Sequence, residues 1–445
     1  MNTLLLYPTD TLFFRDGRPM SGSLRGHGDA WPLPTVVNAA LHAALHRADL
    51  EMIFDDEVHK HRPGRSSNRS PNAERDRKFG SLLSAGPFPV SPSGEWFYPR
   101  PADAQEKGTT AVTLHPASIA GATSLPKPLC FGVANIRPPT KAKPEPWWNS
   151  SAWSAYLGTS KPTNPPIFQL ETHPENGFSD TEHSIGIGIC DITGTQNGNQ
   201  FYSAHSLRLR EGWHLGTLAE ACDKVNGEAA NMRDLIAHVF PNNGARVPII
   251  VGGQQRVCNV ERLEAKPLPL PIGATIKGTR VKWVLLTPAI WPQIGTHPGG
   301  WLPSWIDQAS GQVLLKSGNT TRNEREGREA WRKRVATMSP LPARLVAAIV
   351  PKPVPVTGYA LPNTADPDRP EGGAKSTYLA VPAGAVYYFE ANSPEDATNL
   401  AAALNWHGSN ENPNAIKNRR STLMGEKGFG LGVCGTWDFH PEASA

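Results

Sequence analysis

Proline constrains the fold of this chain more than any other residue, because it occurs 43 times among 445 residues. That frequency is roughly twice the usual share of about 5%. The proline ring removes a backbone N–H, and it is excluded from helix interiors and from central strands. The sequence therefore predicts an architecture that is rich in loops and dominated by strands.

Length and cysteine usage narrow the class of protein further. A chain of 445 residues is long enough for two or three domains, each with its own core. Its five cysteines are widely separated and form no CxxC pair. They argue for reduced cytosolic thiols and against a zinc site or a disulfide framework.

The N-terminal stretch MNTLLLYPTD does not have the pattern of a signal peptide. It carries no basic segment before its leucines, and it reaches Pro8 and Asp10 too early. No run of about 18 apolar residues occurs anywhere in the chain. We therefore expect a soluble, cytoplasmic protein with no membrane partner.

Hydrophobic periodicity and turn residues predict mixed α and β structure in both halves of the chain. The first half contains predicted strands at 3–8, 183–192, 200–209 and 246–253 and predicted helices at 33–50 and 213–225. The second half contains a predicted strand at 281–290, a charged helical segment, a strand at 378–390, a helix at 393–406 with Ser393 as its cap, and a terminal strand rich in glycine.

The segment KPLPLPIG at 266–273 is the best candidate for a linker, because its alternating prolines keep it stiff and extended. It separates residues 1–265 from residues 274–445. The two halves share a similar order of strands and helices, so we expect an α+β protein with two ferredoxin-like (RRM-like) domains. Long proline-rich insertions interrupt the first domain, and the second ends in a glycine-rich loop.

Three clusters of charge stand out although the net charge is only +4. Residues 60–78 hold seven Lys or Arg against two acids, and they predict a mobile basic loop. Residues 321–334 hold six basic and three acidic residues, a pattern typical of a solvated helix face. Residues 416–430 hold four basic residues against one acid and lead directly into the terminal glycines. The third cluster is the most suggestive of a binding surface.

The terminal stretch KGFGLGVCGTWDF, at 427–439, permits three interpretations. A dinucleotide fingerprint requires a following helix, and only ten residues follow Gly435. An RNA-recognition signature is matched at four of seven defined positions. A plain glycine-rich bend would let another backbone approach closely, either RNA or another strand.

No complete enzyme motif is present. GATIKGT at 273–279 resembles a phosphate loop but has Thr279 where lysine is required. His42 and His46 lie four residues apart on a predicted helix without a third ligand, so we expect packing or surface histidines. Asp55 and Asp56 could bind a metal, although a solvated loop is the simpler interpretation. The tryptophans within 141–158 could stack bases, but tryptophans in such a segment more often seal a core or a subunit contact. We predict no metal and no cofactor.

Six blocks of the sequence, in this order, resemble the family of the third subunit of the Cmr complex, a type III-B CRISPR effector that targets RNA. They are PTDTLFFRDGRPM (8–20), WPLPTVVNAALHAAL (31–45), GPFPVSPSGEWFYPRPAD (86–103), VGGQQRV (251–257), LAVPAGAVYYF (379–389) and GEKGFGLGVCGTW (425–437). Asn38 departs from this pattern, since the helix block usually has glycine there. The family belongs to the RAMP group, which implies two ferredoxin-like domains.

The resemblance implies a non-catalytic RNA-binding scaffold. Such a subunit would hold the 5′ handle of the CRISPR guide RNA, join the large polymerase-type subunit to the backbone RAMP subunits, and meet target RNA only indirectly. Phosphate contacts and base stacking would serve this role. The candidate RNA-binding residues are Arg15, Arg18, Arg25, His27, Lys417, Arg419, Arg420, Lys427, Gly428, Gly430 and Gly432.

Two other functions remain open from the residues. A RAMP-fold endoribonuclease that processes repeat RNA could use a histidine such as His27 as general base on a 2′-hydroxyl. A protein–protein adaptor could instead leave its basic loops solvated. Cut RNA ends would favour the first, and absence of salt-sensitive RNA binding would favour the second.

Overall fold

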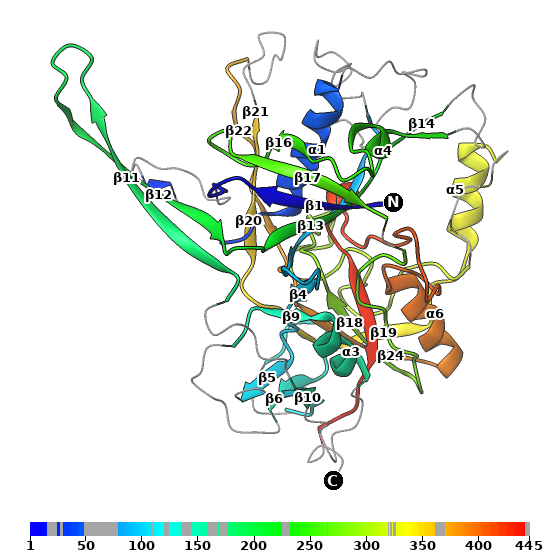
Figure 1. Ribbon diagram of the computed structural model, residues 1–445. Helices are drawn as coiled ribbons and strands as arrows, with labels where there is room; N and C mark the ends of the chain where they lie inside the picture. The colour runs from blue at the N-terminus through cyan, green and yellow to red at the C-terminus, as the bar shows by residue number, and fades with distance from the viewer. Residues whose placement is uncertain are drawn as a thin grey trace.

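The computed structural model describes residues 1–15, 25–26, 30–48, 79–107, 110–119, 124–135, 144–158, 168–169, 177–224, 232–264, 266–318, 320, 323, 326–360 and 370–440. Within these ranges the protein is an α+β structure with mostly antiparallel sheets and few helices (Figure 1). The expectation of a strand-dominated fold is therefore confirmed. No helix in the described part of the chain is long and apolar enough to cross a membrane.

The first half is built on a five-stranded antiparallel sheet with β1 (Asn2–Pro8) at its centre. Successive leucines of β1 enter different cores: Leu4 and Leu6 pack with the first helix, and Leu5 faces the cluster shared with the second half. Both faces of this strand are therefore covered, which explains its unbroken apolar run. The strand order is β16 (Val247–Ile250), β17 (Val257–Leu263), β1, β13 (His214–Glu220) and β3 (Leu83–Val90).

Two helices accompany this sheet. Helix α1 (Pro34–Arg47) begins at a proline in its first turn and buries Val37, Leu41 and Leu45, which confirms the predicted helix. The short helix α4 (Leu235–Val239) is capped by Asp234, whose carboxylate accepts a hydrogen bond from the Ala237 N–H at 3.0 Å.

The second half contains a four-stranded antiparallel sheet in the order β19 (Ala343–Ile349), β24 (Val386–Ala391), β18 (Arg280–Leu285) and β25 (Gly432–Thr436). Helix α6 (Pro394–Leu404) packs on it and begins at Ser393, whose hydroxyl accepts from the Asp396 N–H at 3.1 Å. The predicted cap is confirmed. Helix α5 (Arg328–Thr337) buries none of its residues, as expected for a solvated charged helix.

The prediction of a helix at 213–225 was wrong, because the segment forms β13 and β14 (Cys222–Lys224). Leu215 and Leu218 of β13 enter different cores, and the strand pairs with β1 on one side and β3 on the other. Pairing on both sides outweighs the local helix preference of these residues. The strand predicted at 378–390 is also divided, into β23 (Tyr378–Ala380) and β24.

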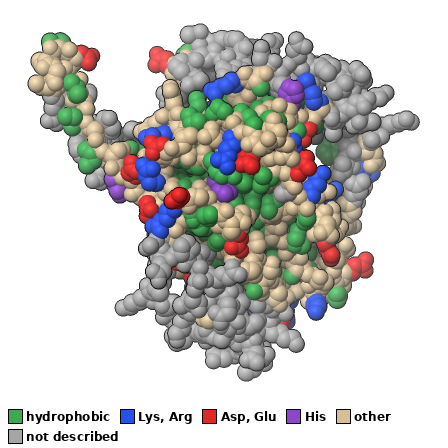
Figure 2. Space-filling model, in the orientation of Figure 1, with side chains coloured by type: hydrophobic (Ala, Val, Ile, Leu, Met, Phe, Trp, Pro, Cys, Tyr) green, Lys and Arg blue, Asp and Glu red, His purple; other side chains and the backbone are tan. Residues whose placement is uncertain are grey.

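A long antiparallel hairpin, β11 (Ser179–Ile189) and β12 (Gln196–Leu209), confirms the strands predicted near 183–192 and 200–209. It projects far from the body of the protein (Figure 1). On the face shown in Figure 2, the coloured basic and acidic side chains lie interspersed instead of forming one basic patch.

The remaining described helices and strands lie in segments of the chain between the strands of the two main sheets. Trp148 of β9 (Trp147–Asn149) and Trp153 of α3 (Ser150–Gly158) are fully buried, which confirms that they seal a core. Leu268 and Leu270 of the 266–273 segment are buried in the same cluster, which draws residues from both halves. The other strands are β2 (Arg25–Gly26), β4 (Phe97–Pro99), β5 (Ala104–Lys107), β6 (Thr110–Thr113), β7 (His115–Ala117), β8 (Gly132–Ala134), β10 (Phe168–Gln169), β15 (Met232–Asp234), β20 (Val354–Val356), β21 (Tyr359–Ala360) and β22 (Gly373–Ala374).

Candidate functional site

The glycine segment, residues 425–436, is built into the interior of the protein. It starts with a 3₁₀ turn (Gly425–Lys427) and ends as β25, which pairs with β18. Every residue from 428 to 436 is buried. No helix follows Gly435 in the described residues, so the geometry gives no support to a dinucleotide site.

The three candidate glycines are surrounded by protein atoms. A Cβ on Gly430, where φ is +76°, would collide with the backbone of Ser421. A Cβ on Gly432 would collide with the indole of Trp283. A Cβ on Gly428, where φ is +103°, would lie 3.1 Å from the Ala85 Cα of β3. Close approach of other parts of the chain therefore accounts for these glycines, and contact of the glycines with RNA stays a prediction.

Arg419 connects the two halves of the protein. Its Nη1 donates to the carbonyl of Ser84 in β3 at 2.6 Å and to the carbonyl of Gly425 at 2.9 Å. Burial lowers the pKa of Arg419 to about 10. The guanidinium thus holds the turn of the glycine segment against the sheet of the first half.

Arg420 is also turned inward. Its Nε donates to the carbonyl of Ala403 at 2.7 Å, and its Nη2 donates to Oδ1 of Asn418 at 3.1 Å. Burial lowers the pKa of Arg420 to about 10. Both arginines were expected to contact RNA phosphates. In this structure Nη1 of Arg419 and the Nε and Nη2 of Arg420 donate to protein oxygens, and the buried Nη2 of Arg419 has no hydrogen-bond partner among the described residues. The sequence could not reveal the contact of Arg419 with Ser84, because the two residues are 335 positions apart.

The remaining candidate residues are placed differently. Lys417 and Arg15 are exposed, and Lys427 is half-buried in the 3₁₀ turn. Arg25 lies in β2, which pairs with the middle of β12, opposite Ser203. Arg18, His27, the Asp55-Asp56 pair and the basic loop at 60–78 lie outside the described residues.

Asn38 lies on α1, at the position where the resemblance led us to expect glycine. Its side chain is buried, and Nδ2 donates to Oγ of Ser84 at 2.9 Å. The carbonyl of the same Ser84 accepts the hydrogen bond from Arg419. Ser84 therefore links helix α1, strand β3 and the glycine segment.

A crevice that the sequence did not reveal lies next to this contact between the two halves. It has a volume of about 320 Å³ and is lined by Trp31, Trp147 and Phe88, together with prolines and residues 286–288 of the second half. The glycine segment forms its backing, since the Leu431 N–H donates to Oγ1 of Thr287 at 3.0 Å and the Gly430 N–H to the carbonyl of Pro288 at 2.8 Å. We name it the aromatic crevice.

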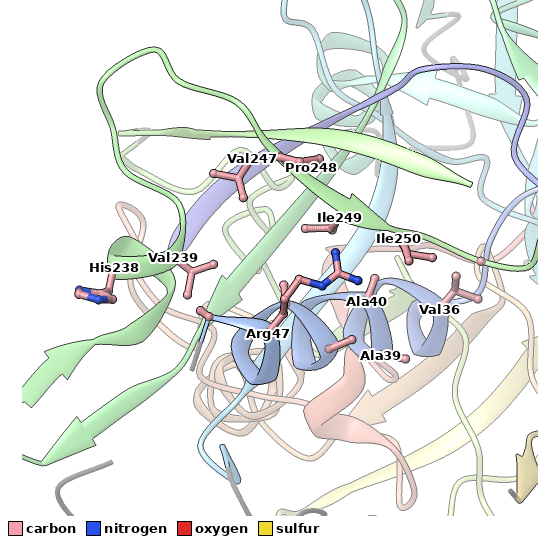
Figure 3. Close-up of a pocket in the computed structure, with 14 residues that line it drawn as sticks. Val36, Ala39, Ala40, Arg47, His238, Val239, Val247, Pro248, Ile249 and Ile250 are labelled. Carbon is pink, nitrogen blue, oxygen red and sulfur yellow. The ribbon is translucent and has the colours of Figure 1, made fainter. Parts of the chain in front are cut away.

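A second hollow, of about 950 Å³, lies between α1 and the edge strand β16 (Figure 3). Its walls are mainly small or aliphatic, including Ala39, Ala43 and Ile250. Figure 3 shows the side chain of Arg47 lying over this groove.

The structure gathers no three His, Cys, Asp or Glu side chains into a possible metal site within its described ranges. His42 and His46 have ring centroids 4.6 Å apart, and His46 packs at 4.9 Å from the ring of Phe79. The interpretation of these two residues as packing histidines is confirmed.

Comparison with known proteins identifies one family over nearly the whole chain. Residues 4–437 match the family described as CRISPR-associated protein (Cas_Cmr3). No functionally curated protein matches the chain.

Several solved structures are similar in part. A chain of the type III-B Cmr-beta complex, bound to cognate target RNA and AMPPnP, is 12% identical with a TM-score of 0.38 and covers 88% of this chain and 86% of its own. A chain of the Csm3-Csm4 subcomplex of the type III-A CRISPR-Cas interference complex is 9% identical with a TM-score of 0.32 and covers 88% of this chain and 93% of its own.

Proposed function

The chain belongs to the Cas_Cmr3 family of CRISPR-associated proteins, and from this membership we propose that it is a non-catalytic, RNA-binding scaffold of a type III-B CRISPR effector complex. It holds the 5′ handle of the guide RNA and joins the large polymerase-type subunit to the backbone RAMP subunits. It meets target RNA only indirectly and works in the cytoplasm. The observation that carries the proposal is the family match, which includes both halves and the glycine segment.

The proposal includes two ferredoxin-like domains, at 1–265 and 274–445, separated by residues 266–273. Six elements of each half follow the order strand, helix, strand, strand, helix, strand, with further elements inserted between them. They are β1, α1, β3, β13, α4 and β17 in the first half and β18, α5, β19, β24, α6 and β25 in the second. In each half, the first and third of these strands are adjacent at the centre of the sheet, and the second and fourth lie outside them. Equal topology in two halves is what duplication of one domain produces.

The glycine segment supports a scaffold role in a different way from the one expected. Its burial and the hydrogen bonds of Arg419 join the two halves. A platform whose parts are already joined loses less conformational freedom when it binds RNA and protein subunits together. Lys417 and Arg15, which are exposed, remain available to neutralise phosphates.

Binding of a labelled handle RNA, measured by fluorescence anisotropy across a salt series, tests the proposal. The Lys417→Ala and Arg15→Ala changes should each weaken binding evenly across sequences and flatten the salt slope by roughly 0.7 for single-stranded RNA. Arg208→Ala is the matched control, because its guanidinium is already paired with Glu182 and Asp10. Equal affinity for handle and scrambled RNA in the assembled complex would contradict handle recognition.

The competing function is a RAMP-fold endoribonuclease that processes repeat RNA. Incubation of the purified chain with repeat RNA, with and without divalent metal, distinguishes the two. Our proposal expects intact RNA. Cleavage that is abolished by His27→Ala would replace the scaffold by the nuclease.

A further inference from the structure

The aromatic crevice lies where several parts of the chain meet, among them Pro146 and Trp147 and the three segments that follow. Residues 30–34 lead into α1, residues 86–88 belong to β3, and residues 286–288 follow β18 of the second half. Its volume of about 320 Å³ is at the lower end of the range for small-ligand sites, about 300–1,000 Å³. The space suits one flat group and not a folded segment.

Two tryptophans, Trp31 and Trp147, make the lining of the crevice aromatic. The rings of Trp31 and Trp147 have centroids 5.2 Å apart and are tilted by 59°. Both side chains are half-buried, whereas Trp148 and Trp153 nearby are fully buried. Nε1 of Trp31 donates to the carbonyl of Pro87 at 2.9 Å, which fixes the ring as a platform. Packing accounts for Trp148 and Trp153, whereas Trp31 and Trp147 line the crevice and also contact the ring of Phe178, with centroids 5.4 and 6.2 Å away.

The described walls of the crevice are neutral and stiff. None of the lining residues carries a charge, and seven are prolines. Proline has a fixed φ and no N–H to offer an anion. A phosphate would find no donor of positive charge here, whereas a neutral aromatic ring would find π faces and apolar contacts.

No basic residue lines the crevice, but one adjoins its wall in sequence. Pro34 lines the crevice and lies 3.4 Å from the position of a Cβ on Gly428. Lys427 immediately precedes that glycine. A cation next to a neutral aromatic hollow is the arrangement that single-stranded RNA requires, with phosphate outside and base inside.

We propose that the aromatic crevice binds one unpaired nucleobase of an RNA strand, stacked on Trp31 with Trp147 closing the side. This inference rests on the proposed function, because it presumes that the chain binds RNA. It adds the position at which a base leaves the strand and the residues that receive it. The hydrogen bond from Trp31 to Pro87 makes the platform ready before RNA arrives.

The test uses handle RNA that carries 2-aminopurine at one position at a time, bound to the full chain in its complex. At one position the 2-aminopurine should lose fluorescence on binding, because it stacks on Trp31. Trp31→Leu and Trp147→Leu should abolish that signal and lower affinity roughly 5- to 150-fold, the range for one base–aromatic stack. Trp147→Phe should retain most of the fluorescence change and most of the affinity, since a π face remains. Ala383→Phe should block the crevice without removing a tryptophan, because Ala383 lines it.

Trp331→Leu is the control, because Trp331 lies on α5 and does not line the crevice. Thermal unfolding identifies variants that fail to fold. Unchanged affinity and fluorescence in folded Trp31→Leu and Ala383→Phe proteins would overturn the inference while leaving the proposed function intact. Normal RNA binding with loss of the large subunit would assign the crevice to a protein partner and overturn it as well. Absence of any RNA binding by the unaltered complex would reject both the proposed function and this inference.

Discussion

Two stretches of this chain have nearly the same local pattern and opposite environments. The glycine segment contains GFGLGVCG, and strand β11 contains SIGIGI, so both alternate glycine with apolar residues. In the first, Phe429, Leu431 and Val433 are 0% exposed. In the second, Ile185 and Ile189 are 70% and 61% exposed. Alternation alone therefore does not determine which face of a strand is buried.

The difference comes from what surrounds each stretch. The glycine segment has β18 beside it, the indole of Trp283 against Gly432 and the backbone of Ser421 against Gly430. Among the described residues, strand β11 pairs only with β12, and the two-residue strand β2 extends the same sheet on the other side of β12. The isoleucines of β11 belong to none of the hydrophobic clusters of the described residues, and they stay exposed. The following substitutions test this comparison in order of decreasing effect.

Glycine substitution should give the largest contrast. Gly430→Ala combines a left-handed φ with a backbone collision and should lower the free energy of unfolding by about 4 kcal/mol or more. Gly194→Ala in the hairpin turn has φ +64° and open space around the new Cβ, so only about 1–2 kcal/mol is expected. Urea unfolding measures both. Equal losses would mean that Gly430 is not packed as described.

Truncation of an apolar side chain should give the next largest contrast. Leu431→Ala removes a fully buried side chain and should destabilise the protein by about 3 kcal/mol. Ile187→Ala removes one that is 49% exposed and should change stability by less than about 0.5 kcal/mol. Thermal or chemical unfolding provides the measurement. A large loss in the Ile187 variant would show that the hairpin is covered in solution.

Removal of an arginine should give a smaller difference in stability between the glycine segment and the hairpin. Arg419→Met leaves the carbonyls of Ser84 and Gly425 without their charged donor and should lower stability by about 2 kcal/mol. Arg208→Met in β12 breaks an exposed ion pair with Glu182 and should cost about 0.2–1 kcal/mol. If both variants unfold at the same urea concentration, Arg419 does not join the two halves.

Acidification should produce the smallest effect. Burial lowers the pKa of His407 in the folded protein, and its Nε2 accepts the Gly273 N–H at 2.9 Å. Below about pH 6.5 the unfolded chain binds the proton and the folded one does not, so stability present above that pH is lost as the pH falls. The loss from one group is at most about 1.4 kcal/mol per pH unit.

His407→Gln should reduce this loss, because an amide oxygen accepts the same hydrogen bond and does not titrate. Burial also lowers the pKa values of His115 and His214, so part of the dependence of stability on pH should remain. Unfolding midpoints between pH 7 and pH 5 provide the measurement. Ile187→Ala in the hairpin should leave the slope unchanged, and an unaltered slope in the His407 variant would exclude this histidine as a contributor.

Elements with strong local signals were predictable. The apolar run of β1, the helix that begins at Pro34 and the cap at Ser393 each depend on residues within a few positions of one another. The helix predicted at 213–225 failed because the strand there is stabilised by partners more than 100 residues away in sequence, β1 and β3. Local preference is outweighed where pairing on both sides is available.

The candidate site was likewise predictable only in part. The sequence indicated the basic and glycine-rich terminus as important, and the structure makes it the junction of the two halves. It could not indicate that Arg419 and Arg420 point inward, since their acceptors Ser84 and Ala403 are unrelated to them by any local pattern. The aromatic crevice was hidden for a similar reason, because Trp31 and Trp147 are 116 positions apart (147 minus 31).

The sequence by itself determined the family, the strand-rich α+β character and the need for glycine at positions 428, 430 and 432. These follow from covalent properties: the missing N–H of proline, the missing Cβ of glycine and the order of residues that a family shares. Only the tertiary structure decided which apolar stretch is buried, what the glycines make room for and which tryptophans keep an accessible face. Burial is a property of neighbours, and the neighbours of the glycine segment come from widely separated positions: Ser84 and Ala85, Trp283 of β18, and Ser421.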